Sequence, residues 1–508
     1  MRPYCKIVGL LLFLTVFLES QAKDFAVKAA YLDFRTQVMT LHAMKGFADD
    51  VATRGLNAIV LEYEATFPFQ ENLTLRNRYA FSEAEIREFI DYCSGIGVEV
   101  IPLQNCFGHA EYILRHERYA SLKENRKDCS QVCPMKIEEA TKVFRSIFGE
   151  VAAMHPSMYI HIGCDETRLL GHCAKCREVV RTSGISKLYV DYVTSMCNIV
   201  TELGKTPMIW ADIILKHPEA LSSLPDNVVI VDWNYGWKPD HFGKMENIEK
   251  SGHPVWGASS LRSHPDNIYL IQWRKHLDNI FDYSDYAASH GFQGFINTSW
   301  STSGTYGYIY DDRDEVVDMQ PVREVYPQNG FDMLDEAYAS AISGKHKDPE
   351  MFLDDYCRIR LGLARAEDIA SVKAYFNMKQ APVYALGGRP DSIRGELDKC
   401  LEVRRCFVEV VFPPQAKAIA EHLELMLDIR INYLKFKLVE ANVESDLFTM
   451  DTLGPLLDEL RLTVSECEKL RKRFFVLHNG YLKDPRKAFD EWTYYGKMKN
   501  LISTLGNM

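Results

Sequence analysis

Eight short apolar runs recur between residues 27 and 300, and this repeat constrains the fold more than any other feature of the chain. Each run is rich in β-branched residues and is followed by a longer amphipathic stretch, a pattern typical of strand-helix units around a parallel sheet. Eight such units fit a closed (β/α)8 TIM barrel better than an open sheet. The runs are Val27 to Asp33, Asn57 to Glu64, Val98 to Asn105, Met158 to Glu166, Pro207 to Asp212, Val228 to Tyr235, Pro254 to Ser259 and Phe292 to Trp300.

Polar or aromatic side chains close seven of these runs. In a parallel barrel the carboxyl ends of all strands meet at one face, and barrel enzymes build their active sites there. A single polar residue where a strand leaves the core needs no functional explanation, but seven together predict a site. The residues are Asp33, Glu64, Asn105 with His109, Asp165 with Glu166, Asp212, Tyr235 and Trp300.

The pattern changes after the eighth run. Ser301 to Asp318 is rich in Tyr, Ser, Gly and Asp, which predicts a loop. Farther on, strand-like runs are scarce, whereas Ala416 to Ala441 and Thr452 to Phe475 carry apolar residues at helical spacing. We therefore predict a catalytic barrel over residues 23–344, followed by an all-helical domain over residues 345–508 that packs on the barrel.

The first 22 residues read as a secretory signal peptide. Arg2 and Lys6 give a basic start, Ile7 to Phe17 is apolar, and Ser20 to Ala22 offers small residues for cleavage. The apolar run is too short to cross a bilayer, which takes about 20 residues. We expect an exported protein, periplasmic or secreted, without a membrane span.

The net charge of the chain disfavours one class of ligand. The chain has 59 Lys and Arg against 70 Asp and Glu, a formal net charge of −11. Nucleic-acid binding depends on clustered basic residues, so this balance disfavours a nucleic-acid partner. A neutral sugar, which needs hydroxyl partners and aromatic faces, remains compatible. The sequence indicates no cofactor, and it does not indicate the oligomeric state.

The fourth run ends in two adjacent carboxylates, Asp165 and Glu166. Neighbouring side chains on a strand point to opposite faces, so both acids can serve one site only if the chain leaves its pleat. Gly163 would allow that bend. The alternative is a surface turn that happens to contain two acids, which the position at the end of a predicted barrel strand disfavours.

Such a pair suits one form of glycoside cleavage. Most glycosidases place two carboxyl groups on opposite sides of the scissile bond. Adjacent residues cannot readily do so, which disfavours a carboxylate nucleophile. A 2-acetamido group on the sugar can instead attack its own anomeric carbon, while Asp165 orients that group and Glu166 transfers the proton. The sugar then supplies the nucleophile.

His161 to Glu166 resembles the catalytic motif of glycoside hydrolase family 20. Four other blocks resemble this family in the same order, namely Leu61 to Glu64, Val100 to Leu103 with Phe107 to His109, Trp210 to Asp212, and Trp256 to Ser259. The resemblance implies a retaining, exo-acting β-N-acetylhexosaminidase that removes terminal N-acetylglucosamine or N-acetylgalactosamine. It also implies Asp165 as the residue that orients the acetamido group and Glu166 as the general acid/base.

The resemblance further implies an aromatic acetamido pocket and a set of polar sugar ligands. Trp210, Trp233 and Trp300 are candidates for its walls and Tyr235 for a hydroxyl that bonds the acetamido oxygen, although core packing would also explain each of them. The remaining predicted substrate-binding residues are Lys28, Asp33, Glu64, His109, His161 and Asp212.

One departure from the family bears on specificity. The family usually places an Arg five residues before the position of Asp33, where this chain has Lys28, and Lys cannot form a bidentate fork. The family's Glu for the outer hydroxyls is not obvious either, with Asp311 and Glu315 as substitutes. Two alternatives follow: a catalytically weak carbohydrate-binding barrel, or a hexosaminidase for sulfated sugars in which Lys28 or Arg262 meets the added anion.

Four cysteines form a separate group. Cys129, Cys133, Cys173 and Cys176 have spacings that suit two disulfides or a structural four-sulfur zinc site, and unpaired thiols are the third reading. We expect no metal in catalysis.

Overall fold

The computed structural model describes residues 23–263, 270–301, 306–310, 316–321, 325–490 and 494–508. The predicted signal peptide, and the substitutes Asp311 and Glu315, lie outside the described residues.

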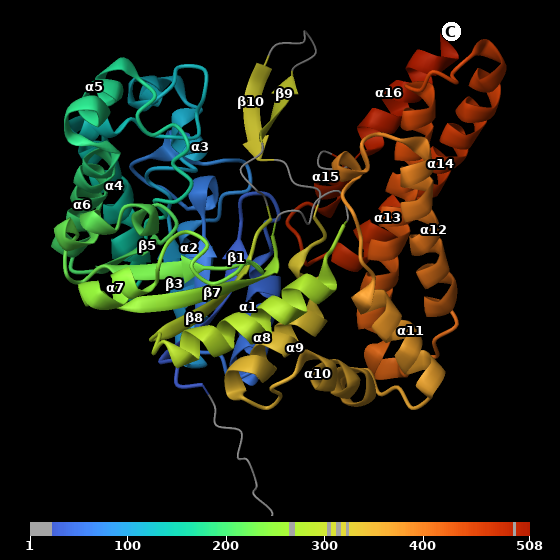
Figure 1. Ribbon diagram of the computed structural model, residues 1–508, viewed down its shortest axis with the longest axis horizontal. Coiled ribbons are helices and arrows are strands. Elements are labelled where there is room, and N and C mark those ends of the chain that lie inside the picture. The colour runs from blue at the N-terminus through green and yellow to red at the C-terminus, as the bar shows by residue number, and fades with distance from the viewer. Residues whose placement is uncertain (1–22, 264–269, 302–305, 311–315, 322–324, 491–493) are drawn as a thin grey trace, which may run out of the picture.

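Eight parallel strands close into a barrel in chain order, from β1 to β8 (Figure 1). The barrel closes where Val27 of the first strand pairs with Gly294 of the eighth. Every predicted run contains or overlaps its strand, so the (β/α)8 fold is confirmed. The strands are β1 Val27–Asp33, β2 Ala58–Glu62, β3 Glu99–Leu103, β4 Tyr159–His161, β5 Thr206–Trp210, β6 Val229–Trp233, β7 Val255–Arg262 and β8 Gly294–Ser299.

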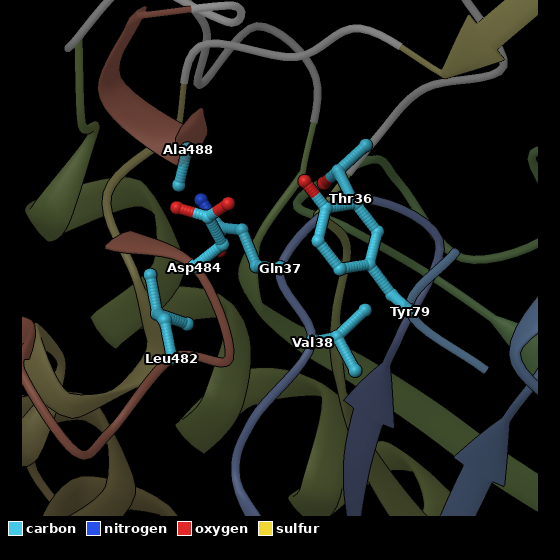
Figure 2. A pocket seen from close by; sticks show the side chains of 7 residues that line it. All are labelled: Thr36, Gln37, Val38, Tyr79, Leu482, Asp484 and Ala488. Carbon is cyan, nitrogen blue, oxygen red and sulfur yellow. The ribbon is translucent and has the colours of Figure 1, made fainter. Parts of the chain in front are cut away.

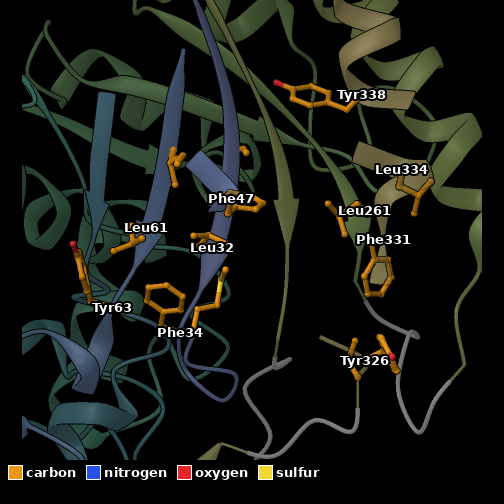
Figure 3. Close-up of a cluster of buried hydrophobic side chains, with 14 of the residues drawn as sticks. Leu32, Phe34, Phe47, Leu61, Tyr63, Leu261, Tyr326, Phe331, Leu334 and Tyr338 are labelled. Atoms are coloured by element: carbon orange, nitrogen blue, oxygen red, sulfur yellow. The ribbon is translucent and has the colours of Figure 1, made fainter. Parts of the chain in front are cut away.

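Alternate residues of each strand face the barrel interior and the surrounding helices. On β1, Ala29 and Tyr31 pack inside the barrel, whereas Ala30 and Leu32 belong to the larger core under the helices. Figure 3 shows Leu32 in that outer core beside Leu61. This alternation fixes which side chains can reach a site at the carboxyl-end face.

Helices cover the outside of the barrel because each buries one apolar side. Ser82 and Glu85 form a capping box at the start of α2, and Ile86, Phe89 and Ile90 of that helix are buried. The helices of this layer are α1 Leu41–Thr53, α2 Glu83–Gly95, α3 Glu111–Leu114, α4 Ile137–Met154, α5 Ala174–Ser183, α6 Ile185–Glu202, α7 Glu246–Ser251, α8 Trp273–Ser289 and α9 Asp332–Ser343.

The segment after β8 differs from the prediction of a loop. It contains two antiparallel strands, β9 Tyr306–Tyr310 and β10 Val316–Pro321, which project beyond the barrel (Figure 1). Aromatic and β-branched residues favour strands, and this segment carries three tyrosines in five residues over Tyr306–Tyr310. The Ser and Gly content pointed to a loop but did not exclude a short ribbon.

The rest of the chain is helical and stands beside the barrel (Figure 1). The two longest helices contain the predicted helical segments. Within the described part of the chain, no helix combines the length and apolar character needed to cross a bilayer. The helices are α10 Pro349–Asp355, α11 Ala366–Asn377, α12 Pro390–Phe407, α13 Lys417–Val443, α14 Met450–His478, α15 Pro485–Asp490 and α16 Tyr495–Gly506.

The helical region contacts the barrel at the chain segment after β1. The amide of Thr40 donates to the carbonyl of Tyr481 at 2.9 Å, and the amide of Lys483 donates to the carbonyl of Val38 at 2.9 Å. Figure 2 shows Val38 and Gln37 of this segment facing Leu482 and Asp484 across a small pocket. The segment that follows the carboxyl end of β1 is therefore hydrogen-bonded to the helical region.

Candidate active site

The two adjacent acids lie on a loop that leaves the strand early. Strand β4 ends at His161, and Gly163, Cys164 and Glu166 have φ angles of +72°, +70° and +46°. A Cβ atom on Gly163 would lie 2.1 Å from Oδ1 of Asn105, so only glycine fits there. The bend expected at Gly163 is present, and it breaks the alternation that would have sent Asp165 and Glu166 to opposite faces.

His109 joins the two acids. Its Nε2 atom lies 3.4 Å from Oδ2 of Asp165 and 3.3 Å from Oε2 of Glu166. The side chain of Asp165 is 11% exposed and that of Glu166 is 30% exposed, so solvent reaches the second acid more than the first. Both carboxylates therefore face one imidazole, and Glu166 lies toward the opening.

The pKa values of His109 and Glu166 move in opposite directions. Burial disfavours the imidazolium, but Asp165 and Glu166 outweigh it and raise the pKa of His109 well above its usual value. Burial likewise disfavours the Glu166 carboxylate, but hydrogen bonding to His109 and the charge of Arg168 lower the pKa of Glu166 to about 2. The free protein therefore carries one proton on the His109–Glu166 pair over a wide pH range.

This shared proton makes a prediction about the pH profile. The pair loses its proton as the pH rises through the raised pKa of His109, which sets the alkaline limb of kcat/KM. In a His109→Gln variant the proton lies on Glu166 alone, as an ordinary carboxyl. We expect the alkaline limb to move to lower pH. An unmoved limb would contradict a shared proton. Glu178→Gln is the control, because Glu178 is an exposed partner of Arg181 on α5 and lies outside the site.

A second charged network lies at the ends of β1 to β3. Arg35 binds Asp33 through two hydrogen bonds, from Nε to Oδ1 at 3.0 Å and from Nη2 to Oδ2 at 2.8 Å. Its Nε also lies 3.5 Å from Oε1 of Glu62. Sequence reasoning missed Arg35, although it follows Asp33 by two residues and therefore lies beside it just past the strand end.

Burial changes the charge state of the acids in this network. It raises the pKa of Glu62 to about 7 and that of Glu64 well above its usual value, although the charge of Arg35 opposes both shifts. Tyr31 donates to Oε2 of Glu62 at 2.6 Å, and Asn105 donates to Oε1 of Glu62 at 2.8 Å. The network thus offers both donors and acceptors, which is what recognition of sugar hydroxyls requires.

Asp212, at the end of β5, holds the acid loop. Its Oδ2 accepts a hydrogen bond from the backbone amide of Glu166 at 3.1 Å, while its Oδ1 is buried and has no partner among the described residues. Burial and the nearby charge of Asp165 raise the pKa of Asp212 to about 7.

Aromatic side chains from four strand ends gather beside the acids. The ring of Trp300 lies 5.0 Å from Tyr31 and 5.9 Å from Trp210, and its Nε1 donates to the hydroxyl of Tyr235 at 2.9 Å. Trp233 lies 4.9 Å from Tyr235. The structure therefore brings together all four aromatic residues that the sequence singled out.

His161 lies beneath this group. It is buried against Trp210 at 4.3 Å, and burial lowers its pKa to about 3, so it is neutral. Its Nδ1 accepts a hydrogen bond from the amide of Gly163 at 3.1 Å. This bond supports the bend of the acid loop.

Two predicted cations do not reach the site. Lys28 is five residues before the carboxyl end of β1, about 16 Å along the strand, and it shares the outward direction of Ala30. Arg262 is buried, and its guanidinium bonds Ser299, Gln37 and the carbonyl of Tyr326. The prediction that Lys28 binds substrate is wrong, and neither cation is placed to meet a sulfated sugar.

Comparison with known proteins identifies the family. Residues 60–301 match the family model for the glycosyl hydrolase family 20 catalytic domain. Hexosaminidase D of Bos taurus is 32% identical over 263 residues, which cover 48% of this chain and 76% of that protein. The chain belongs to glycoside hydrolase family 20. The family 20 match runs from β2 to the residue after Trp300 and so contains the Asp165–Glu166 loop, but it leaves out β1, Asp33 and Arg35.

Two further proteins resemble this family 20 chain. Hexosaminidase D of Homo sapiens is 28% identical over 307 residues, 57% of this chain and 63% of that protein. The solved structure of a β-N-acetylhexosaminidase from Bacteroides fragilis NCTC 9343 is 17% identical, with a TM-score of 0.49 over 67% of this chain and 70% of that chain.

Proposed function

We propose that this family 20 glycoside hydrolase is a retaining, exo-acting β-N-acetylhexosaminidase whose substrate supplies the nucleophile. The observation that carries the proposal is the position of Asp165 and Glu166 on one loop, with both carboxylates within 3.4 Å of the same imidazole nitrogen of His109. Acids on adjacent residues of one loop, both turned toward one imidazole, approach a bound sugar from the same side, whereas a direct nucleophile and a general acid act from opposite sides of the glycosidic bond.

In the first step the carbonyl oxygen of the 2-acetamido group attacks the anomeric carbon, and the bond to the leaving oxygen breaks. His109 passes the proton of the pair to Glu166, which donates it to that oxygen. Asp165 accepts a hydrogen bond from the acetamido N–H and balances the positive charge of the oxazolinium ring. Oδ1 of Asp165 is buried without a partner among the described residues, which suits an acceptor that the substrate completes.

In the second step water opens the ring from the opposite side. Glu166, now ionised, takes a proton from this water, and the product keeps the β configuration because the anomeric carbon has been inverted twice. The proton from the water restores the one that the His109–Glu166 pair gave up in the first step.

The aromatic group gives the acetamido methyl an apolar site. Trp210 and Trp300, whose rings lie 5.9 Å apart, would contact the methyl group. The Tyr235 oxygen already accepts a hydrogen bond from Trp300, so its own proton can be given to the acetamido oxygen. The network of Asp33, Arg35 and Glu62 would then bind the outer hydroxyls. Whether this network prefers the gluco or the galacto epimer is decided by comparing kcat/KM for both.

The experiment that tests the proposal compares substrates that differ only at carbon 2. A nitrophenyl β-N-acetylglucosaminide should be hydrolysed at least roughly 1,000 times faster than the matching β-glucoside, because the glucoside lacks the intramolecular nucleophile. A thiazoline that mimics the oxazoline should inhibit. Similar rates on the two substrates would overturn the substrate-assisted mechanism, and binding of N-acetylhexosamine without hydrolysis would favour a carbohydrate-binding barrel.

A further inference from the structure

A compact group of three thiols and one carboxylate lies apart from the acids. The ligand atoms of Glu124, Cys133, Cys173 and Cys176 all lie within 4.8 Å of one another. Three of these residues belong to the cysteine group noted in the sequence, and Glu124 stands in the place that the four-sulfur reading gave to Cys129.

The local chain path explains the replacement. Lys123 and Val132 form an antiparallel bridge, and the amide of Glu124 donates to the carbonyl of Gln131 at 3.1 Å. This pairing places Glu124 next to Cys133 and leaves Cys129 in the turn that connects the paired segments. The spacing of the cysteines in the sequence contains no information about this register.

The distances suit one tetrahedral ion. The sulfur of Cys133 lies 3.8 Å from that of Cys173 and 3.6 Å from that of Cys176. Zinc binds sulfur at about 2.3 Å, which gives a tetrahedral edge of about 3.8 Å. A disulfide needs about 2.05 Å and would use only two of the three sulfurs. A disulfide would leave the closeness of the third sulfur and the carboxylate unexplained.

The surroundings also suit a closed site. Glu124, Cys133 and Cys176 are buried, and Leu188 packs on the two cysteines. Oε1 of Glu124 accepts a hydrogen bond from the amide of Cys173 at 2.7 Å, while Oε2 lies 3.2 Å from the sulfur of Cys176. One carboxylate oxygen is thus fixed by the backbone, and the other points at the sulfurs, as in a metal site whose ligands are oriented by outer contacts.

We propose that Glu124, Cys133, Cys173 and Cys176 bind one structural Zn²⁺. Four protein ligands leave no open position, so the ion takes no part in the hydrolysis. Glu124 and Cys133 follow His109 in the segment between β3 and α4, whereas Cys173 and Cys176 follow Glu166 after β4. The ion therefore fastens together the two loops that carry His109 and the acid pair.

The test measures zinc in the purified full chain, prepared with a thiol reductant and then freed of loose metal. We expect about one zinc per chain, released when the thiols are modified. Cys133→Ser and Cys176→Ser should reduce the zinc to background, because each removes one of only four ligands. Cys129→Ser should keep about one zinc, since that cysteine lies in the same segment outside the ligand set.

A spectroscopic measurement covers the case in which the ligand variants do not fold. The wild-type chain loaded with Co²⁺ should show the sulfur-to-metal charge-transfer absorption and the visible bands of tetrahedral thiolate coordination. The proposal is overturned if the wild-type chain binds no zinc or cobalt. It is also overturned if peptide mapping of the chain purified without reductant finds a disulfide between two of the three cysteines, or if Cys129→Ser loses as much zinc as Cys176→Ser.

Discussion

Replacing Glu166 by Gln should lower kcat on a β-N-acetylhexosaminide by roughly 100- to 10,000-fold, because general acid catalysis supplies that much and an amide cannot transfer the proton. The fold should be unaffected. The hydrogen bond to the Asp212 carboxylate comes from the backbone amide of residue 166, which the variant keeps. The lost contact with Arg168 costs little, because Arg168 is 77% exposed and such ion pairs are weak.

The leaving group provides a sharper test of the role of Glu166. A dinitrophenol leaves readily without a proton, whereas a sugar alcohol does not, so the loss of kcat should be much smaller for the dinitrophenyl glycoside. Equal losses on both substrates would show that Glu166 acts in some other way. Glu178→Gln on α5 is the matched control, because Glu178 is an exposed partner of Arg181 and lies outside the site.

The barrel could be predicted because hydrophobic periodicity depends on local sequence. β1 spans the residues that the apolar run indicated, and the other strands start or end within a few residues of their runs. β4 is the informative exception. Its run continues to Glu166, but the strand ends at His161 because Gly163 and Cys164 adopt positive φ angles that a pleated strand cannot accommodate.

The sequence also predicts the polar residues at the strand ends. It does not predict which side chains form ion pairs or hydrogen bonds with them. The resemblance to the family points to Lys28 at the start of β1. The side-chain alternation along β1 turns Lys28 outward, whereas Arg35 lies beside Asp33 past the end of the strand. The ion pair between Arg35 and Asp33 depends on the chain path after the strand. Glu124 could not be found from the cysteine spacing either, since its place beside Cys133 depends on the pairing of Lys123 with Val132.

Gly108 shows how closely the two catalytic loops pack, and replacing it by Ala should have a large effect. A Cβ atom at Gly108 would lie 2.1 Å from the carbonyl oxygen of Asp165, which is a backbone atom that cannot rotate away. The loop with His109 and the loop with the acids must then move apart. A displacement of about 1 Å in a catalytic group can cost on the order of 100-fold, so we expect a loss of about that size in kcat/KM.

A glycine within a helix provides a control, which shows whether Gly→Ala substitution lowers activity only where the added Cβ atom collides with the neighbouring loop. Gly149 lies within α4, and a Cβ atom there would meet nothing within 4 Å. Gly149→Ala should therefore keep kcat/KM and raise stability by roughly 0.5 to 1 kcal/mol, since Ala favours the helix. Thermal unfolding and kcat/KM measured on both variants decide the matter. If Gly108→Ala kept kcat/KM within a few-fold of the wild type, contact between these loops would not be what positions His109 against Asp165 and Glu166.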